Sequence, residues 1–401
     1  MANVSSSNGL EKRPKLRFPG FDEPYRKCRI GDIYAERSQR GAGDMELLSV
    51  TMNNGVMPRS EIEGKDNSSE DKSNYKVVCK GDIVYNSMRM WQGANGVSNY
   101  DGIVSPAYTV LMPTEEIDNQ YFAALFKTSN LINEFRKNSQ GLTSDTWNLK
   151  YPQIRAIKLY IPSLQEQHKI SSFISTLEER IGKQRQLIDD LKKYKRGAVR
   201  YLLSPKSCPL KNARWTTAKL GELGSFVKGA PLSKADISED GTPFILYGEL
   251  YTTYNEVVTS VKRRTQAQVD ELFLSRVGDV VIPTSGETSE EISTASCVML
   301  PGVILAGDLN IFRSDKVDGR IMSYLLNHVV NAKIARIAQG KSVVHIQASE
   351  LGKLTLSYPD ENTQKKLIDF LSKFDDKIVI EENALTFLTG LKEGLMQQLF
   401  I

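Results

Sequence analysis

Cysteine and histidine are rare in this chain of 401 residues, and long apolar runs are missing from it. The cysteines lie far apart, form no Cys-x-x-Cys pair and have no histidine cluster nearby: Cys28, Cys79, Cys208 and Cys297. This spacing argues against a zinc site and against a disulfide framework. We therefore expect no metal in this chain, and a reducing compartment.

The apolar segments are too short for a membrane protein. A membrane-spanning helix needs about 18 apolar residues in succession, and no segment approaches that length. The basic residues near the start, up to Lys15, have no apolar run behind them, which argues against a signal peptide. We expect a cytoplasmic protein without membrane contact, beginning with an N-terminal arm over residues 1–24 that is flexible at its start.

Signatures of catalysis are also missing. The chain has no Pro-Pro pair, so it lacks the Pro-Pro-aromatic motif of adenine methyltransferases, and it has no glycine-rich cofactor loop. Residues 335–342 fit an A-x4-G-K-S pattern, but helix-like residues precede Gly340 and strand-like residues follow it, the reverse of a phosphate-binding loop. Asp375 and Lys377 mimic a nuclease motif, yet they lie in a heptad-patterned helix. We expect no catalytic residue, and structural roles for the histidines, His168, His328 and His345.

The overall charge is only mildly basic. A net charge of +4 and a pI near 8.6 permit nucleic-acid binding, but they are equally compatible with many other functions. Any basic binding surface must therefore be local.

The strongest signal present is an internal repeat. When Pro162 is placed over Pro359, the two following segments run in register, without a gap, to Ser204 and Ile401. The same offset superimposes the Gly-Asp-Ile-Val run that begins at Gly81 on a Gly-Asp-Val-Val run in the second half. A whole half of the chain is thus duplicated, and a repeat of this length determines the fold.

Each half reads in the same order: short strand-like runs, a helix, a last strand and one long final helix. We expect strands near residues 83–85, 108–112, 157–161 and 280–283. In the final helices apolar residues recur with heptad spacing. The positions that we expect to pair the helices are Ile174, Leu177, Ile181, Ile188, Leu191, Leu371, Phe374, Ile378, Leu385 and Leu388.

A helix of about 40 residues is about 60 Å long, which exceeds what one small domain needs. The simplest partner is the other copy, running antiparallel, with polar seam residues that fix the register: Gln184, Glu381, Lys195 and Lys392. The alternative is that each helix only covers its own domain.

These patterns predict an α+β protein built as a tandem pseudo-twofold repeat. Two small α/β modules, at residues 25–161 and 215–358, are separated by two long helices that form an antiparallel coiled coil. The helices occupy residues 162–204 and 359–401, and residues 205–214 are a linker. Two such modules at a fixed separation suit the reading of two short, separated sequence elements on a duplex. The helices are similar and the modules diverge, as expected if the modules specify and the helices space them.

Several runs of residues together resemble the specificity subunits of type I restriction-modification enzymes. They are LRFPGF from Leu16, GDIVYNSMRMWQG from Gly81, GIVSPAYTVLMP from Gly102, the W-x4-LGEL opening at Trp215, and the final helix that ends twice, in Leu202-Leu203 and in Leu399-Phe400. Each motif alone is weak, but their order and duplication are specific, and the resemblance covers nearly the whole chain.

The resemblance implies two target recognition domains, each of which binds one half of a bipartite, asymmetric site on double-stranded DNA. It also implies that the helices dock two methyltransferase subunits and, through them, the restriction subunits. The cofactors then belong to the partners: S-adenosylmethionine to the methyltransferase subunit, which methylates N6 of a flipped adenine, and ATP and magnesium to the restriction subunit. The chain itself is then a non-catalytic subunit.

Candidate reading residues of the first module follow the strand at residues 83–85. Arginine pairs with guanine, and asparagine or glutamine with adenine, so Asn86, Arg89 and Gln92 are suited to base edges. The alternative is a solvated loop beside a core formed by Met88, Met90 and Trp91. We favour DNA contact for Arg89 and Gln92, and packing for Trp91. Three arginines in polar loops are as suited to phosphates as to bases: Arg37, Arg40 and Arg59.

The equivalent loop of the second module carries Thr284, Ser285 and Glu287 and no basic residue, so the two modules are not expected to read the same bases. The further candidates in this module are Lys228, Tyr247, Glu249, Lys262, Arg263, Arg264 and Lys341. The basic run at residues 262–264 suits phosphates, but it equally fits a solvated face.

Two other functions stay open at this point. One is a coiled-coil scaffold whose paired modules bind protein partners, which strong dependence on DNA sequence would exclude. The other is an ATPase or nuclease, for which Lys341→Ala or Asp375→Ala would abolish an activity of the isolated chain.

Overall fold

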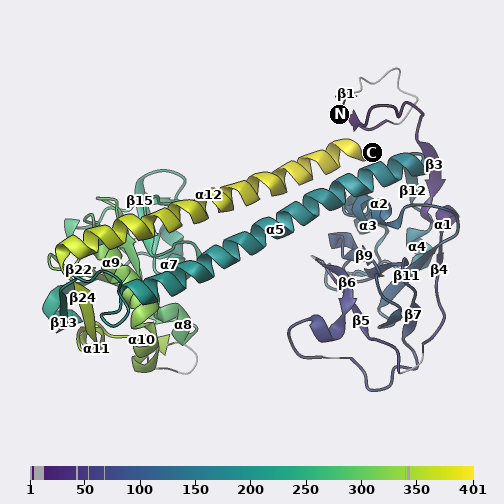
Figure 1. The fold of residues 1–401 in the computed structure, drawn as a ribbon. Coiled ribbons are helices and arrows are strands. Elements are labelled where there is room, and N and C mark those ends of the chain that lie inside the picture. Colours follow the sequence, from purple (N-terminus) through teal and green to yellow (C-terminus); the bar gives the residue numbers. More distant parts are fainter. Residues whose placement is uncertain are drawn as a thin grey trace. The chain divides into compact units, whose positions relative to one another are not determined.

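The computed structural model describes residues 2–3, 13–41, 44–52, 54–66, 68–338, 340 and 344–401. The chain divides into two compact units, Met1–Arg185 with Asn383–Ile401, and Gln186–Glu382. Both contain helices and sheets, and each contains one part of both long helices, α5 (Leu164–Leu202) and α12 (Glu361–Leu399) (Figure 1). The mixed α+β class is therefore confirmed.

The first unit is centred on a four-stranded antiparallel sheet. Its strand order is β4 (Tyr34–Glu36), β11 (Tyr108–Pro113), β8 (Ile83–Asn86) and β9 (Asn95–Val97). Four two-stranded pairs accompany it: β1 (Ala2–Asn3) with β2 (Leu16–Arg17), β3 (Arg26–Arg29) with β12 (Lys158–Ile161), β5 (Leu48–Thr51) with β6 (Gly55–Pro58), and β7 (Lys76–Val78) with β10 (Gly102–Val104). The helices are α1 (Ile30–Ile33), α2 (Asn119–Leu125), α3 (Ser129–Asn138) and α4 (Tyr151–Ile154), with 3-10 turns η1 (Arg59–Glu61) and η2 (Met90–Gln92).

The second unit repeats this plan around a five-stranded sheet. Its order is β14 (Ser225–Lys228), β22 (Leu309–Arg313), β18 (Asp279–Pro283), β20 (Ser296–Val298) and β16 (Val257–Val258). The other sheets are β17 (Arg263–Thr265), β15 (Thr242–Leu246) and β21 (Ile304–Ala306); β13 (Trp215–Lys219) with β24 (Thr355–Pro359); and β19 (Ser285–Gly286) with β23 (Val344–His345).

The helices of the second unit follow the order of those in the first. They are α6 (Leu220–Leu223), α7 (Glu249–Thr252), α8 (Ser289–Ile292), α9 (Gly319–Tyr324), α10 (Asn331–Ile337) and α11 (Ala348–Gly352), with 3-10 turns η3 (Lys234–Asp236) and η4 (Glu271–Phe273) and a π-helical turn η5 (Leu325–Val329).

The sequence repeat is a repeat of structure, down to strand register. Val84 pairs with Val110 in the first unit, and Val281 pairs with Ile311 in the second, so the two Gly-Asp runs open the same central strand. The expected strands at 83–85, 108–112, 157–161 and 280–283 are present as β8, β11, β12 and β18. The predicted tandem repeat is thus confirmed.

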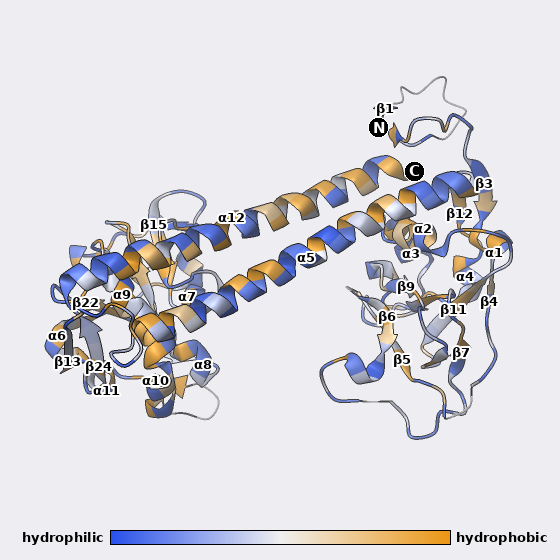
Figure 2. Ribbon diagram, viewed as in Figure 1, coloured by the Kyte–Doolittle hydropathy of each residue, from blue (hydrophilic) through white to orange (hydrophobic). Residues whose placement is uncertain are grey.

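Each unit's core takes residues from opposite ends of the two long helices. In the first unit, Ile170 and Ile174 of α5 join Met396 and Leu399 of α12 in one core. In the second, Val199 of α5 and Leu203, just after the helix, join a core with residues of the first turns of α12, Leu367, Ile368 and Leu371. Within each unit the two helices therefore run antiparallel, and apolar and hydrophilic residues alternate along both of them (Figure 2).

The heptad positions are buried along most of α5, but not at its end. Ile174, Ile181 and Ile188 are buried, as are Leu371 and Ile378 of α12, whereas the other expected pairing residues are half-buried: Leu177, Leu191, Phe374, Leu385 and Leu388. Continued from Leu191 by seven and then four residues, the heptad spacing reaches Ala198 and Leu202. The structure instead buries their neighbours, Val199 in α5 and Leu203 just after it. An α-helix has 3.6 residues per turn, so its buried face drifts from a strict heptad.

The first turns of both long helices are held to their units in the same way. The Gln167 amide donates to the carbonyl of Pro162 and accepts from the backbone NH of Asp118, both at 3.0 Å. Gln364 makes the same two bonds, to Pro359 and from Asp318, both at 2.8 Å. Each glutamine thereby joins the start of a long helix to the N-terminus of α2 or α9.

Candidate nucleic-acid interface

The central strand of each unit begins with a turn that a buried aspartate holds. Asp82 accepts hydrogen bonds from the backbone NH of Cys79 at 2.9 Å and from Arg37 Nε and Nη2 at 2.6 and 3.0 Å. In the second unit Asp279 accepts hydrogen bonds from the backbone NH of Arg276, in the turn before the strand, at 2.9 Å and from the Arg313 guanidinium at 3.2 Å. The loops that follow these strands therefore leave from equivalent, rigid positions.

Beyond β8, the first unit presents a short loop with one free cation. Asn86 Oδ1 accepts from the backbone NH of Met88 at 3.0 Å and so turns the chain out of the strand. Arg89 is exposed, and its side chain has no hydrogen-bond or ion-pair partner among the described residues. Gln92 is half-buried, and Gly93 ends the turn with a φ of +85°. A side chain without an internal partner is available to an outside ligand.

Trp91 lies between these residues and packs against the protein. Its ring meets the Trp147 ring edge to face with centroids 5.2 Å apart, its Nε1 donates to the carbonyl of Met88 at 3.0 Å, and Arg136 lies 6.0 Å from the ring centre. This tryptophan supports the loop that carries Arg89 and Gln92.

The three loop arginines have different surroundings. Arg37 is held by Asp82, so little of it is left for a phosphate. Arg40 is exposed and donates to the carbonyl of Asn74 at 2.6 Å. Arg59 donates to the carbonyls of Ile62, Gly64 and Lys65 at 2.7, 3.1 and 2.7 Å, so its guanidinium organises the loop after β6.

In the second unit the structure brings most candidates to two adjoining grooves. Lys228 and Thr284 line one groove together with Asn310. Tyr247, Glu249 and Arg263 line the other. The grooves share three residues of two loops, Leu232, Gly307 and Asp308. Residues that are far apart in the sequence thus face one surface.

Several of these candidates shape the grooves. Glu249 is 5% exposed and accepts from the backbone NH of Leu246 at 3.0 Å and from Arg263 Nε at 2.8 Å. Ser285 is 4% exposed and donates to Asp308 at 3.0 Å.

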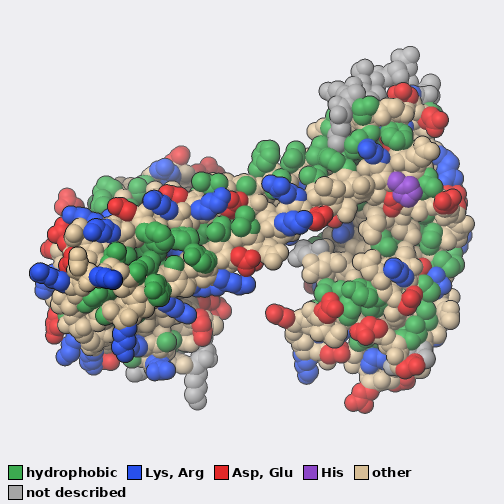
Figure 3. All heavy atoms as spheres, viewed as in Figure 1, with side chains coloured by type: hydrophobic (Ala, Val, Ile, Leu, Met, Phe, Trp, Pro, Cys, Tyr) green, Lys and Arg blue, Asp and Glu red, His purple; other side chains and the backbone are tan. Residues whose placement is uncertain are grey.

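Three of the basic candidates of this unit are exposed: Lys228, Lys262 and Arg264, the last donating to the carbonyl of Gly241 at 2.8 Å. Lys341 lies outside the described residues. On the face shown in Figure 3, basic and acidic side chains are interspersed.

Asn310 is a groove residue that the sequence did not single out. It is 2% exposed, and its Nδ2 has no hydrogen-bond partner in the described structure. The equivalent position in the first unit is Thr109, whose hydroxyl bonds that of Ser87 at 2.8 Å. A buried amide donor without a partner is available to an acceptor on a ligand. It lies inside a strand, and no sequence pattern marks it.

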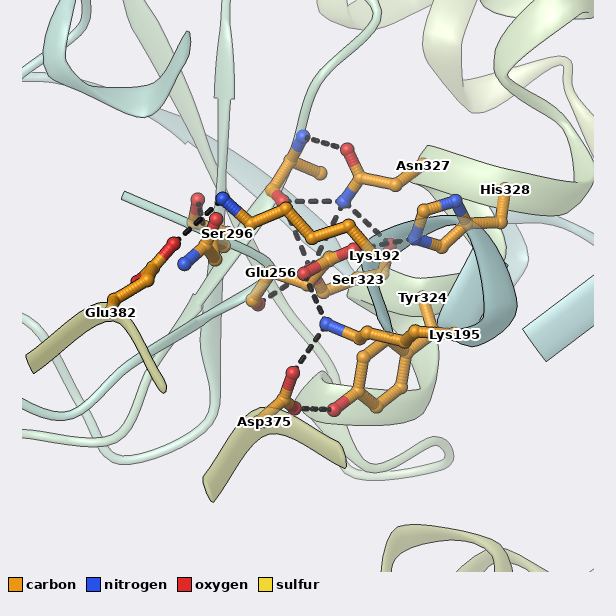
Figure 4. Close-up of polar contacts among 12 residues, drawn as sticks. Lys192, Lys195, Glu256, Ser296, Ser323, Tyr324, Asn327, His328, Asp375 and Glu382 are labelled. Atoms are coloured by element: carbon orange, nitrogen blue, oxygen red, sulfur yellow. Dashed lines mark hydrogen bonds and ion pairs between the residues drawn. The ribbon is translucent and has the colours of Figure 1, made fainter. Parts of the chain in front are cut away.

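A second feature missed by the sequence is a buried charge cluster between the long helices and the second module (Figure 4). Lys195 of α5 forms ion pairs with Glu256, at 2.6 Å, and with Asp375 of α12. Glu256 also bonds His328 Nε2, and Asp375 accepts from the Tyr324 hydroxyl. We call these five residues the charge cluster.

Mutual pairing sets the protonation of the charge cluster. Burial alone would raise the pKa of Glu256, but the hydrogen bond with His328 and the charge of Lys195 outweigh it and lower that pKa to about 2. Burial opposes the charge on Lys195, yet Glu256 and Asp375 together raise its pKa above the ordinary value. The pair Lys195 and Glu256 is therefore ionised at neutral pH.

The charge cluster fixes the segment between α7 and β16 to α5. Ser323 Oγ donates to the carbonyl of Glu256 at 2.7 Å, and Ser296 Oγ donates to that of Asn255 at 2.8 Å. The carbonyl of His328, in the π-helical turn η5, accepts from Arg200 Nε of α5 at 3.1 Å. In the first unit, the equivalent pair of Lys392 with Glu178, at 2.8 Å, is more exposed.

Neither a metal centre nor a membrane span is found in the described part of the chain. No group of three or more His, Cys, Asp or Glu side chains among these residues could hold a metal ion. None of the described helices is long and apolar enough to cross a membrane.

Comparison with known proteins gives a consistent family. A family model described as the type I restriction modification DNA specificity domain matches residues 27–193 and again 212–389. A candidate specificity subunit of type I restriction enzyme MjaX from Methanocaldococcus jannaschii is 23% identical over 84% of this chain and 81% of that protein. The MjaVIII specificity subunit of the same organism is 21% identical over 82% of this chain and 81% of its own length.

Two solved structures share the fold. One is the type I restriction-modification S subunit from M. genitalium, with a TM-score of 0.58 and 15% identity, covering 97% of this chain and 99% of that one. The other comes from work on complex assembly and conformational transition of the type I R-M system, with a TM-score of 0.60 and 15% identity, covering 96% and 99%. Together with the twofold match to the family model, the repeated fold shows that this chain belongs to the family of type I restriction-modification DNA specificity proteins, with two specificity domains in tandem.

Proposed function

We propose that this chain is the specificity subunit of a type I restriction-modification system and that its two modules read the two unlike halves of a bipartite DNA site. The observation that carries this proposal is the pair of equivalent but differently equipped loops. After the same aspartate-held strand, one module presents the free cation Arg89, and the other presents Thr284 beside the unpartnered amide of Asn310. Two modules that share a scaffold but present different polar groups are suited to two half-sites of different sequence.

The proposed DNA contacts are those that the structure leaves available. In the first module they are Arg89 and Gln92, supported by Asn86, with Arg40 near a phosphate. In the second they are Lys228, Tyr247, Thr284 and the exposed Lys262 and Arg264, with Glu249, Arg263 and Ser285 shaping the grooves. We do not include Arg37, because Asp82 holds it, or Arg59, because its guanidinium donates to three carbonyls of its own loop.

The long helices are the proposed dock for two methyltransferase subunits and, through them, the restriction subunits. Several apolar side chains on these helices are exposed: Tyr194 at 66%, Val379 at 49%, Ile380 at 59% and Phe387 at 70%. Exposed apolar residues gathered on helices are typical of protein interaction sites. In this proposal the chain is non-catalytic, S-adenosylmethionine binds the methyltransferase subunits, and ATP and magnesium bind the restriction subunits.

Selection of bound duplexes from a random-sequence pool tests the proposal, using the full chain with its methyltransferase subunits. We expect enrichment of two short defined elements separated by a fixed undefined spacer. Affinity for the selected duplex should fall steeply with salt, because phosphate contacts release counterions. Retention of DNA without any enriched sequence would contradict a reading function and favour a protein scaffold.

A further inference from the structure

A rigid loop of the first module carries the most exposed leucine of the described chain. Leu142 has a relative exposure of 101%, and the next most exposed large hydrophobic side chain, Phe387, has 70%. The loop, residues 140–148, follows α3, and its polar residues from Thr143 to Thr146 are also exposed. When a partner covers an apolar side chain that is fully exposed to water, the free energy falls.

Internal hydrogen bonds give this loop a fixed shape. Gln140 and Asn148 exchange backbone hydrogen bonds at 3.0 and 2.8 Å across its base. At its tip, the Thr146 hydroxyl donates to the carbonyl of Thr143 at 2.9 Å and accepts from its NH at 3.2 Å. Gly141 has a φ of +143°, and a Cβ there would lie 2.6 Å from the carbonyl oxygen of Thr146, so only glycine fits. The exposure of Leu142 is therefore built into the loop.

The loop is joined to the segment that carries Arg89 and Gln92. The backbone NH of Leu149 donates to the carbonyl of Ser87 at 2.8 Å. Trp147, at the end of the loop, packs against Trp91, which lies between Arg89 and Gln92. Leu142 is thus carried by the same rigid assembly as the candidate base-reading side chains.

The charges around this assembly favour a polyanion as the occupant. Arg89, Arg136 and Lys150 are exposed. Of the nearby carboxylates, Glu134 is paired with Lys137 at 2.7 Å, which leaves Asp145 at the tip of the loop. An exposed apolar side chain on an assembly that also carries exposed cations and hydroxyl groups suits a DNA groove, where proteins place leucine against the apolar parts of bases.

We propose that Leu142 enters the groove of the half-site read by the first module and packs against the bases there. This inference rests on the proposed function and adds a specificity-determining contact to it. Two apolar features of DNA would receive the side chain, the 5-methyl group of a thymine and the face of a partly unstacked base.

The test compares Leu142→Ala with Leu272→Ala, which removes another exposed leucine, 51% exposed, from the second unit. Binding of the complex with methyltransferase subunits is measured on the selected duplex and on duplexes with one half scrambled. We expect Leu142→Ala to weaken binding to the selected duplex about tenfold or more, and to have no effect once the first half is scrambled. Leu272→Ala should stay within about twofold of the unmodified chain on every duplex.

Modified duplexes identify the receiving feature. Uracil in place of thymine in the first half would reproduce the loss if a methyl group is contacted. A 2-aminopurine in that half would lose its binding-induced fluorescence in Leu142→Ala if a base is unstacked.

Three results would overturn the inference. Leu142→Ala could bind like the unmodified chain, it could lose affinity without a response to either modified base, or it could keep DNA affinity and lose the methyltransferase subunit. If the unmodified chain itself shows no sequence preference, the proposed function fails as well, and the two failures are thus distinguishable.

Discussion

Arg37 and Arg89 lie in the same module, but their surroundings are opposite. Arg37 is 19% exposed and donates twice to Asp82, which is 4% exposed, whereas Arg89 is exposed and has no partner in the described structure. We expect Arg37→Ala to lower the free energy of unfolding by about 3 kcal/mol, because it leaves a buried carboxylate unpaired. Arg89→Ala should change it by less than about 0.5 kcal/mol and lower affinity for the selected duplex.

Urea unfolding and duplex binding, measured on both variants, check this contrast. Arg89→Lys serves as the control, because it keeps the charge but loses the planar pairing with a guanine. A stability loss in Arg89→Ala, or an intact fold with weak DNA binding in Arg37→Ala, would reverse the assignment of the two residues.

The lowered pKa of Glu256 predicts that the stability of the fold falls in acid. Its pKa in the folded chain is about 2, against an ordinary value of 4.5. A carboxyl group whose pKa is lowered by folding stabilises the fold at pH values above its ordinary pKa. That stabilisation is lost as the pH falls from 4.5 toward 2. Glu256→Gln should therefore reduce the fall in unfolding free energy across this window, by about 2 to 3 kcal/mol.

Unfolding at a series of pH values between 4.5 and 2 measures the effect. Glu239→Gln, at an exposed position of the same unit, is the matched control and should leave the profile unchanged. Equal pH profiles for the unmodified chain and Glu256→Gln would show that the charge cluster does not hold Glu256 ionised.

At the scale of elements, the glutamines that begin α5 and α12 are predicted to lock each helix to its unit. Gln364 is 4% exposed; its side chain donates to the carbonyl of Pro359 and accepts from the backbone NH of Asp318. Gln364→Ala leaves both groups without that partner, so we expect a loss of about 1 to 3 kcal/mol in unfolding free energy. Hydrogen exchange of the Asp318 amide should rise, whereas Gln398→Ala, at an exposed position of α12, should change neither quantity.

The elements that the sequence predicts best are those with local periodicity. The two long helices and the central strands follow from heptad spacing and from the duplicated Gly-Asp runs. The shift from Ala198 to Val199 at the end of α5 was not predicted, because helical drift appears only when the helix meets a core.

Polar contacts between residues that are far apart in the chain could not be predicted from the sequence. Nothing near Lys195 indicates that Glu256 and Asp375 neutralise it, and nothing near Arg37 indicates that Asp82 holds it. The prediction that Arg89 contacts DNA stays a prediction, although its exposed position is compatible with it.

At the scale of the whole molecule, the tandem repeat predicts that specificity is modular. Each module has its own core, and each unit holds its own pair of helix ends. Exchanging residues 25–161 for the equivalent segment of another family member should therefore change one half of the recognised site and leave the other half unchanged. A change in both halves would show that the modules do not read independently.

The most direct test of the central claim is co-expression of this chain with its methyltransferase subunit, followed by genome-wide mapping of N6-methyladenine. We expect a single bipartite motif whose two defined, unlike halves are separated by a spacer of fixed length. A stable complex that methylates no defined motif, or a motif with two identical halves, would contradict it.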